Sequence, residues 1–359
     1  MKVGIVGLPN AGKSSLFSAL TGVAAEAANY PFTTIEPNLA VVPVGDPRLD
    51  AVAGTVGASS VVPDTITFHD IAGLVAGAHR GEGLGNRFLA NIRETDAIVH
   101  VVRVHGDPGV VHPEGRVDPL ADIETVETEL IYADLEQAER RLERVERAAR
   151  GGDRRAVTEE RWLRELIAAL QAGRPARAVP PPPDAPELVS LLQPLSAKPV
   201  LYVANVEEGA HAVPQEIEDY ARSQRAQAVA ISARLEAELA ELPPEEAEAM
   251  RAELGLAESS LDAVIRGAFS LLELIAFFTA DTDKPAQSWH LRRGLSVWHA
   301  AGLIHSDIQR GFVRAEVIGW DQLLDAGGYA GARERGTLRL EGRDYVVADG
   351  DVIHVRFTP

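Results

Sequence analysis

The sequence predicts an α/β protein in which a mostly parallel sheet carries an inserted helical hairpin and is followed by a small β-rich unit. Three patterns indicate this fold class. Short apolar runs alternate with helical or loop segments through most of the first 275 residues, as in parallel sheets with helices on both faces. Residues 120–172 depart from that alternation and have long helical periodicity, and the sequence after residue 276 alternates short strand-like runs with turns.

The expected strands of the parallel sheet are short apolar runs bounded by helical or loop sequence. They lie at residues 3–6, 39–44, 65–69, 97–104, 199–204 and 227–231. In the C-terminal unit the strand-like runs lie at residues 287–291, 312–318, 345–347 and 352–357. We therefore expect a nucleotide-type domain over 1–120 and 186–275, a helical insertion over 121–185, and a third domain over 276–359.

The insertion is expected to be an antiparallel pair of amphipathic helices. Apolar side chains recur at three- to five-residue steps over residues 122–150, Gly151 and Gly152 would end that helix, and residues 157–170 would form the second. Interleaved Glu and Arg side chains would coat the outer faces. Such a hairpin can be a solvated structural element or a partner-binding arm, and the sequence leaves both open.

Composition excludes several classes of protein. The chain has 359 residues and no cysteine, which excludes disulfides, thiolate metal sites and a cysteine nucleophile. We find no apolar leader and no run long enough to span a membrane, so a cytoplasmic protein without a membrane partner is expected. The net charge is −18, and residues 179–275 alone hold 17 acidic and 6 basic side chains. Contacts with RNA are therefore expected from the more balanced hairpin and C-terminal unit.

Residues 7–14 match the phosphate-binding pattern G-x-x-x-x-G-K-S and lie between a predicted strand and a predicted helix, the context that this motif needs. Glycines let successive backbone N–H groups point at phosphates, and the helix adds its positive end. Lys13 is expected to contact the β- and γ-phosphates, and the Ser14 hydroxyl to bind Mg²⁺. The predicted nucleotide-binding residues of this loop are Asn10, Ala11, Gly12, Lys13, Ser14 and Ser15.

Asp70 closes the strand that is expected beside the phosphate loop, and Gly73 follows it in a D-x-x-G pattern. A carboxylate there can hold Mg²⁺ through water, and the Gly73 N–H can meet a γ-phosphate. Thr34 could supply a second hydroxyl to the metal, or its segment could be an ordinary turn. Leu74 stands where many GTPases carry a water-orienting Gln, so the attacking water must be positioned from elsewhere.

A base-binding position is expected at residues 205–208, directly after a predicted strand. GTPases use Asn-Lys-x-Asp there, and the Asp accepts from the N1–H and 2-amino group of guanine. Here Val206 replaces the Lys and the longer Glu208 replaces the Asp, whereas Asn205 can still pair with the N6/N7 edge of adenine. Ser232 and Ala233 are expected to back the base with main-chain N–H groups.

Together these motifs resemble the YchF-type, Obg-like ribosome-binding ATPases, a branch of the translation-factor GTPases. The similarity covers essentially the whole chain, and further matching segments lie at residues 30–38, 70–79, 81–86, 205–208, 300–307, 311–318 and 340–354. The resemblance implies a Ras-like P-loop NTPase domain, an inserted hairpin and a C-terminal TGS domain.

The resemblance also implies activity, cofactors and partners. It implies Mg²⁺-dependent hydrolysis of ATP in preference to GTP, and association with the ribosome; a K⁺ requirement stays open, and we expect a monomer. The implied catalytic residues are Lys13, Thr34, Gly73 and His112, and the implied metal ligands are Ser14, Thr34 and Asp70. His112 matches a family histidine proposed to aid hydrolysis.

Two other functions fit the same residues. The first is an Obg-class GTPase with the same fold, and the second is a non-hydrolysing adaptor whose hairpin and C-terminal domain bind the ribosome. Competition between ATP and GTP separates the first alternative from the leading hypothesis, and turnover in the presence of ribosomes separates the second.

Overall fold

The computed structural model describes residues 1–26, 38–71, 84–107, 110–113, 115–256 and 259–358. Two compact units are present. The larger contains Met1–Glu26, residues 38–41 and Thr67–Leu271, and the smaller contains Val42–Ile66 and residues 272–358. This division differs from the expected one, in which residues 1–120 stay together, because residues 42–66 pack with the C-terminal part of the chain.

The larger unit is built on a six-stranded sheet of order β2-β4-β1-β5-β6-β7. Its strands are β1 (Lys2–Val6), β2 (Leu39–Pro43), β4 (Thr65–Asp70), β5 (Ala97–Arg103), β6 (Val200–Asn205) and β7 (Gln227–Ile231). The pairs β1–β4, β1–β5, β5–β6 and β6–β7 are all parallel. All six strands expected for the parallel sheet are thus present, with bounds that differ by a residue or two.

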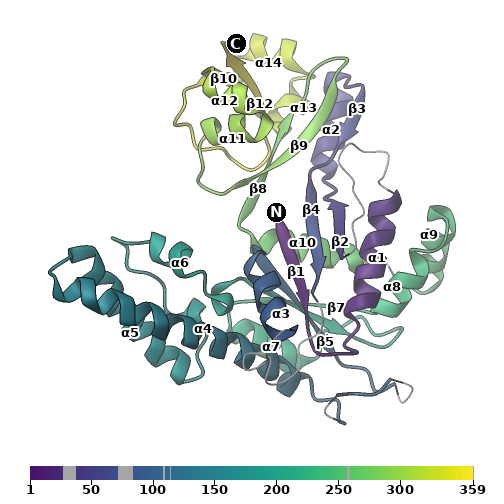
Figure 1. Cartoon of the computed structure of the whole chain (residues 1–359). Helices are drawn as coiled ribbons and strands as arrows, with labels where there is room; N and C mark the ends of the chain where they lie inside the picture. Colours follow the sequence, from purple (N-terminus) through teal and green to yellow (C-terminus); the bar gives the residue numbers. More distant parts are fainter. Residues whose placement is uncertain (27–37, 72–83, 108–109, 114, 257–258, 359) are drawn as a thin grey trace. The chain divides into compact units, whose positions relative to one another are not determined.

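Helices cover both faces of this sheet (Figure 1). The helices of this unit are α1 (Lys13–Glu26), α3 (Leu84–Arg93), α4 (Pro119–Arg150), α5 (Arg154–Gln171), α6 (Glu187–Leu192), α7 (Gln215–Ser223), α8 (Ala233–Leu239), α9 (Pro244–Glu253) and α10 (Ser260–Leu271). Apolar side chains of α3, α4 and α7 share one core cluster with the sheet, which includes Ile92, Ile123 and Tyr202. On the other face the Leu201 side chain lies against Gly267 of α10. A sheet buried on both faces explains the near-continuous apolar runs of its strands.

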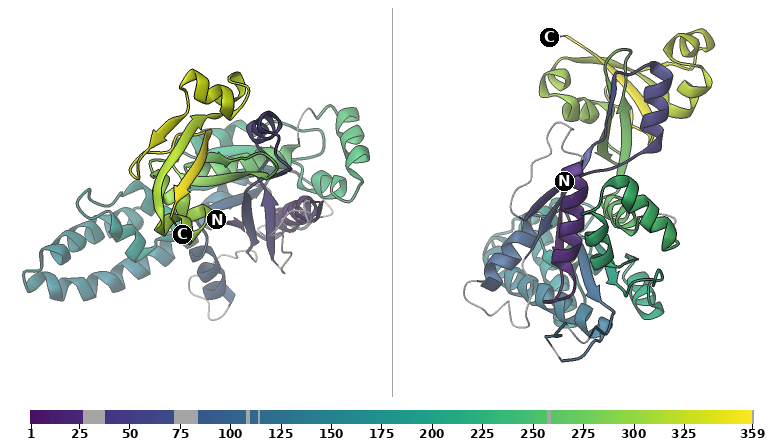
Figure 2. Two further views of the ribbon diagram at one scale, coloured as in Figure 1. Left: turned by 90° about the horizontal axis from the view of Figure 1, so that it is seen from above. Right: turned by 90° about the vertical axis from the view of Figure 1, so that its right-hand side faces the viewer.

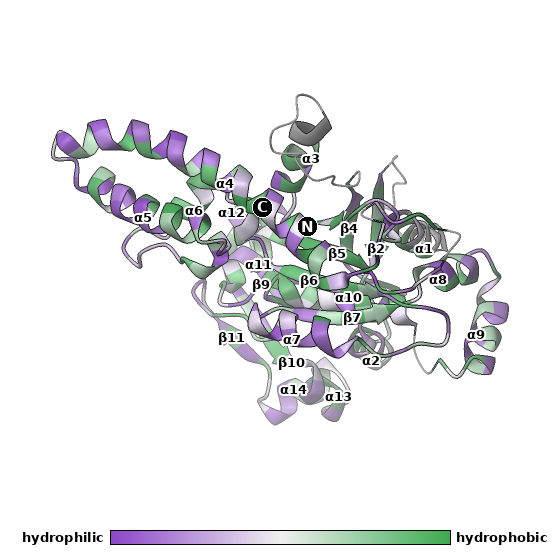
Figure 3. Cartoon of the chain, turned by 90° about the horizontal axis from the view of Figure 1, so that it is seen from below, coloured by the Kyte–Doolittle hydropathy of each residue, from purple (hydrophilic) through white to green (hydrophobic). Residues whose placement is uncertain are grey.

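The expected helical hairpin is formed by α4 and α5, which pack against each other and lie side by side in the left view of Figure 2. Asp118 and Asp153 cap the two helices, because their carboxylates accept backbone N–H groups of the first turns. A separate apolar cluster, including Leu163 and Leu166, fills the space between the helices. Figure 3 shows hydrophilic residues along both helices, interrupted by apolar ones, as the amphipathic pattern predicts.

The smaller unit contains a second six-stranded sheet, of order β11-β10-β12-β8-β9-β3. Its strands are β3 (Ser60–Val62), β8 (Leu274–Thr279), β9 (Pro285–Arg292), β10 (Phe312–Gly319), β11 (Arg339–Glu341) and β12 (Asp351–Phe357). Its helices are α2 (Pro47–Val56), α11 (Val297–Ile304), α12 (Ser306–Arg310), α13 (Trp320–Asp325) and α14 (Tyr329–Arg335).

Three of the four strand-like runs expected in this unit are β9, β10 and β12. The fourth, 345–347, is not a strand, because Val346 makes only an isolated bridge to Ser296. Residues 42–66 join this unit by strand pairing, by apolar packing and by polar contacts. β3 pairs in parallel with β9, and Leu49 and Val52 of α2 share an apolar cluster with Phe278 of β8. Within the described residues, no helix is both long and apolar enough to cross a membrane.

Candidate functional site

The phosphate-binding pattern forms the turn between β1 and α1, as its sequence context predicts. Gly7 has φ +150°, and a Cβ there would lie 2.4 Å from the Val101 carbonyl oxygen of β5, so a larger residue would collide with the sheet. Gly12 has φ +104°, and its carbonyl accepts the Leu16 N–H in the first turn of α1. The two glycines therefore let the loop pass close to β5 and enter the helix.

Lys13 is the first residue of α1, directly after this loop, and is 7% exposed. Its Nζ donates to the Leu8 carbonyl at 2.7 Å. Burial lowers the pKa of Lys13 to about 8, an effect that nearby Asp70 partly opposes. Burial also raises the pKa of Asp70, which Lys13 partly offsets. Among the residues that the structure describes, no carboxylate forms an ion pair with this ammonium, so an anion at the loop would compensate a charge that burial disfavours.

The residues expected to hold Mg²⁺ are described in part. Asp70 ends β4 and pairs in register with Ile5 of β1, and Ser14 is an exposed residue in the first turn of α1. Thr34 lies outside the described residues, as do Gly73 and Leu74. A hydroxyl and a carboxylate are oxygen donors of the kind that Mg²⁺ takes together with phosphate and water. The described residues contain no cluster of three His, Asp or Glu that could hold a metal by itself. That donor set suits Mg²⁺ bound together with a phosphate ligand.

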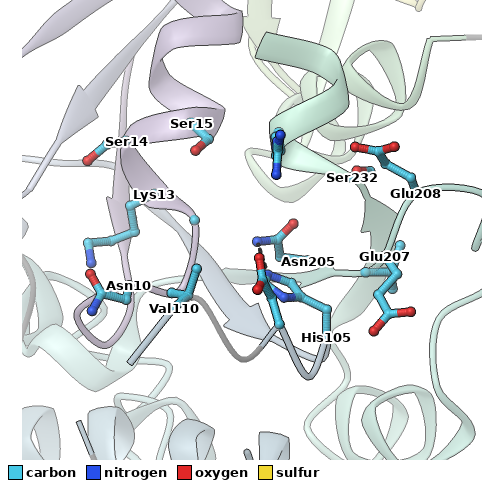
Figure 4. A pocket seen from close by; sticks show the side chains of 14 residues that line it. Asn10, Lys13, Ser14, Ser15, His105, Val110, Asn205, Glu207, Glu208 and Ser232 are labelled. Carbon is cyan, nitrogen blue, oxygen red and sulfur yellow. Dashed lines mark hydrogen bonds between the residues drawn. The ribbon is translucent and has the colours of Figure 1, made fainter. Parts of the chain in front are cut away.

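A cavity of about 600 Å³ opens at the carboxyl ends of β1, β5 and β6. This is where open α/β sheets place their ligands. Figure 4 shows Asn10 and Lys13 on one side of the cavity, Glu208 and Ser232 on the other, and Asn205 between them. Its lining residues are Asn10, Gly12, Lys13, Ser14, Ser15, His105, Asp107, Val110, Asn205, Val206, Glu207, Glu208, Ser232 and Arg234. The predicted phosphate-binding and base-binding segments thus share one cavity.

Asn205 links three segments at the centre of this site. Its Nδ2 donates to the Ala11 carbonyl at 3.0 Å, and its Oδ1 accepts the Ala233 N–H at 3.1 Å. Both atoms that were expected to pair with adenine therefore already have a protein partner. Nδ2 also lies 3.5 Å from His105 Nε2, whereas Oδ1 keeps a further lone pair. A base could therefore donate to Oδ1 in addition to the Ala233 N–H.

The other expected base-binding residues lie at the far end of the cavity. Val206 is 5% exposed, whereas Glu208 is an exposed residue. Ser232 is buried and precedes α8, whose first residue Ala233 uses its N–H for Asn205. Ala11 and Ala233 thus contact Asn205 rather than line the cavity.

His112 is not among the cavity-lining residues. It is buried, and its Nε2 lies 2.8 Å from Oδ2 of Asp122 near the start of α4. Burial raises the pKa of Asp122, and the hydrogen bond with His112 acts in the opposite direction. In this structure the ring is held against the hairpin, apart from the residues that line the cavity.

Five lining residues were not among the predicted site residues: His105, Asp107, Val110, Glu207 and Arg234. The His105 Nε2 lies 3.5 Å from Asn205 Nδ2, and burial lowers the pKa of His105. A topological signal for the first three was present, because they follow a strand expected to lie beside the phosphate loop, and ligands bind outside strand carboxyl ends.

The chain matches two family models. Residues 2–140 match a model described as 50S ribosome-binding GTPase, and residues 274–358 match the C-terminal model of YchF GTPases, which is described as a protein of unknown function. The proteins named ribosome-binding ATPase YchF from Bacillus subtilis and Haemophilus influenzae are 47% and 46% identical to it. Each alignment covers 99% of both chains.

Solved structures agree with these matches. The YchF GTPase of Schizosaccharomyces pombe has a TM-score of 0.88 and 34% identity, covering 99% of this chain and 97% of that one. A GTP-binding protein from Pyrococcus horikoshii OT3 has a TM-score of 0.63 at 20% identity and full coverage of both chains, a similarity of fold alone.

Proposed function

Because the chain belongs to the YchF family, we propose that it binds ATP with Mg²⁺, hydrolyses it to ADP and phosphate, and works as a nucleotide-dependent switch on the ribosome. The observation that carries this proposal is the cavity that Lys13 lines on one side and Glu208 on the other, with Asn205 between them. Its volume of about 600 Å³ falls in the range of small-molecule sites.

The choice of ATP over GTP rests on the base end of this cavity. Guanine needs a carboxylate that accepts from two donors, and Glu208 is one methylene longer than the Asp that does this in GTPases. Val206 is buried and apolar where those proteins carry a lysine. Neither change disturbs an adenine base, which lacks both guanine donors.

In this proposal Ser14, Thr34 and Asp70 would hold Mg²⁺, which when bound supplies positive charge to the phosphates. Lys13 would exchange the Leu8 carbonyl for phosphate oxygens, and the Gly73 N–H would meet the γ-phosphate. His112 would help to orient the attacking water, which requires that its ring leave Asp122. Replacing His112 by Ala should therefore lower kcat while the Kd for ATP stays unchanged.

The proposed ribosome contacts are the hairpin α4–α5 and the C-terminal unit, which we propose to be a TGS domain spanning residues 276–359. Both segments are nearly balanced in charge, unlike residues 179–275. Arginines can then contact rRNA phosphates without the repulsion of an acidic surface. The setting implied by this partner is the cytoplasm, and the proposed form is a monomer. A K⁺ requirement can be tested by replacing K⁺ with Na⁺ in the hydrolysis assay.

Two measurements test the function. In the first, unlabelled ATP and GTP compete for a labelled ATP analogue, and ATP is expected to displace it at the lower concentration. Tighter displacement by GTP would favour the Obg-class alternative. In the second, phosphate release is followed with Mg²⁺, with and without ribosomes. Slow release that ribosomes accelerate is expected, whereas none in either condition would favour the non-hydrolysing adaptor.

A further inference from the structure

Arg103 is the last residue of β5 and is 2% exposed. Its guanidinium is bonded entirely by backbone carbonyl groups of the segment that follows. Nε donates to His105 O at 3.1 Å, Nη2 to Asp107 O at 2.8 Å, and Nη1 to Val110 O at 2.9 Å. Each nitrogen of the side chain therefore holds a different residue of that segment.

The three residues bonded by Arg103 are the three residues of this segment that line the nucleotide cavity. Figure 4 shows His105 and Val110 at the cavity, on the side of Asn205 and Asn10 respectively. Arg103 itself is not a lining residue, so it holds this wall by its main chain from outside the cavity.

The segment is tied to the rest of the site at both ends. Asn10 Nδ2 donates to Val111 O at 2.9 Å, which joins it to the phosphate loop. The Val104 N–H donates to Asn205 O at 3.0 Å, which joins it to β6. Between these two ties, Arg103 makes three bonds, one each to His105, Asp107 and Val110. Weaker bonds add to them, from the Val110 N–H to Asp107 O at 3.2 Å and from the Gly106 N–H to Glu207 Oε1 at 3.4 Å.

Ending a strand with a buried cation that has only carbonyl partners is unfavourable in free energy. Burying a charge costs free energy unless it is fully hydrogen-bonded, and no carboxylate pairs with Arg103 among the described residues. The planar guanidinium presents its donors in a fixed fork, which a lysine cannot reproduce. We propose that Arg103 is a positioning residue that shapes the nucleoside end of the ATP cavity by holding the wall formed by His105, Asp107 and Val110.

This inference rests on the proposed function for the identity of the ligand. It predicts that loss of Arg103 weakens the binding of ATP more than the binding of phosphates alone. Without Arg103 the wall would adopt the binding geometry for only part of the time, and the apparent Kd rises by the inverse of that fraction. Asn10 joins the phosphate loop to this segment by one side-chain bond, but the loop also has a backbone bond of its own, from the Ala11 N–H to Leu8 O at 3.3 Å. Binding of a ligand that consists of phosphates alone should therefore change much less than binding of ATP.

The test compares Arg103→Met, Arg103→Lys and the wild type in the full chain. The matched control is Arg177→Met, because Arg177 is another largely buried arginine of the same unit, paired with Glu127 at 2.6 Å and outside the cavity lining. Dissociation constants for ATP and for inorganic tripolyphosphate are measured by calorimetry with Mg²⁺, and unfolding is followed in denaturant.

We expect Arg103→Met to raise the Kd for ATP about tenfold and to leave that for tripolyphosphate within about twofold, as for a wall correctly formed a tenth of the time. Arg103→Lys should fall between it and wild type. Arg177→Met should change stability but neither Kd. Three results would overturn the proposal. They are an equal rise of both Kd values in the Arg103 variants, an unchanged Kd for ATP in those variants, or the same rise of the Kd for ATP in Arg177→Met.

If Arg103→Met does not fold, Arg103→Lys decides by the same comparison, with an expected rise of about threefold for ATP alone. A wild-type chain that binds tripolyphosphate but no nucleotide would refute the proposed function itself. If the wild type binds ATP and the Arg103 variants bind it with the same Kd, only the role of Arg103 would be refuted.

Discussion

Gly12 and Asn205 are in direct contact: a Cβ on Gly12 would lie 2.2 Å from the Asn205 Nδ2. The Asn205 amide thus occupies the space where any residue other than glycine at position 12 would place its Cβ. The same amide bonds Ala11 O and Ala233 N, so a side chain at position 12 would displace a group that holds both of these segments.

Gly12→Ala should therefore weaken ATP binding and lower the free energy of unfolding by about 1–3 kcal/mol, since φ +104° is strained for alanine and Asn205 must move. Calorimetry and denaturant unfolding measure both effects. Gly54→Ala is the matched control, because Gly54 lies in α2 with open space around it and should be neutral or slightly stabilising. Wild-type ATP affinity in Gly12→Ala would show that the amide has room to shift.

Lys13→Ala should raise the Kd for ATP about 10- to 100-fold, the scale of a lost charge-assisted hydrogen bond, and abolish turnover. The fold should persist, because the one hydrogen bond lost is that to Leu8 O. Lys198→Ala is a suitable control, since that lysine also bonds backbone carbonyls, at Arg93 and Thr95, but does not line the cavity. Unchanged ATP affinity and turnover in Lys13→Ala would refute the assignment of the site.

Glu208→Asp combined with Val206→Lys should shift the preference toward GTP by about 1–3 kcal/mol, the scale of a good bidentate base contact. Competition for one labelled analogue measures this shift. Because Val206 is buried, Glu208→Asp alone should be tested beside the double variant, to separate a change of selectivity from a loss of stability. If the preference does not move, selectivity depends on the backbone around Ser232.

Charge reversal of Arg140, Arg144 and Arg147 on α4 should weaken co-sedimentation with ribosomes and flatten its salt dependence, with ATP binding unchanged. Of these three, Arg140 pairs with Glu136 at 3.3 Å, and all three are exposed. Neutralising Glu136, Glu139 and Glu143 on the same helix is the opposite control and should strengthen binding. If the arginine variant co-sediments like the wild type across a salt series, these arginines do not contact the ribosome and serve only as exposed, paired side chains of the hairpin surface.

His100 should make stability depend on pH between about 6.5 and 4. It is buried in β5, and burial lowers its pKa to about 4, with Glu127 opposing the shift. Between about pH 6.5 and pH 4, His100 is protonated in the unfolded chain but neutral in the folded chain. The free energy of unfolding is therefore highest above about pH 6.5 and falls as the solution is acidified. This group should cost about 2 kcal/mol between pH 7 and pH 5. Denaturant unfolding of His100→Gln should lose that part of the slope; an identical slope would refute the assignment.

Local patterns allowed much of the site to be predicted. The phosphate loop and Asn205 each follow a strand with a recognisable apolar run, and the parallel sheet brings those strand ends together. The role proposed for Arg103 left no such mark, because its partners are backbone carbonyls, which every residue carries. The bonds of Asn205 to Ala11 and Ala233 were hidden for the same reason.

The C-terminal unit was predicted less completely. β8 was missed, because its apolar run directly follows α10 and has no turn residues to separate it from a helix. β3 has three residues, and its partner β9 lies far along the chain, so no local periodicity reveals the pair. Residues 345–347 have the composition of a strand, but a single bridge at Val346 is all they form.

The parallel pairing of β3 with β9 has a consequence for the order in which this protein can be completed during synthesis. Translation releases α2 and β3 early, yet the strands and helices that cover Leu49, Val52 and Val56 come from the last part of the chain. Until residue 357 has left the exit tunnel, this early segment has an uncovered apolar surface while the sheet around the phosphate loop can already assemble. A chain stopped near residue 272 would thus keep every cavity-lining residue but hold an unsatisfied helix and strand in its middle, a ready target for chaperones and proteases.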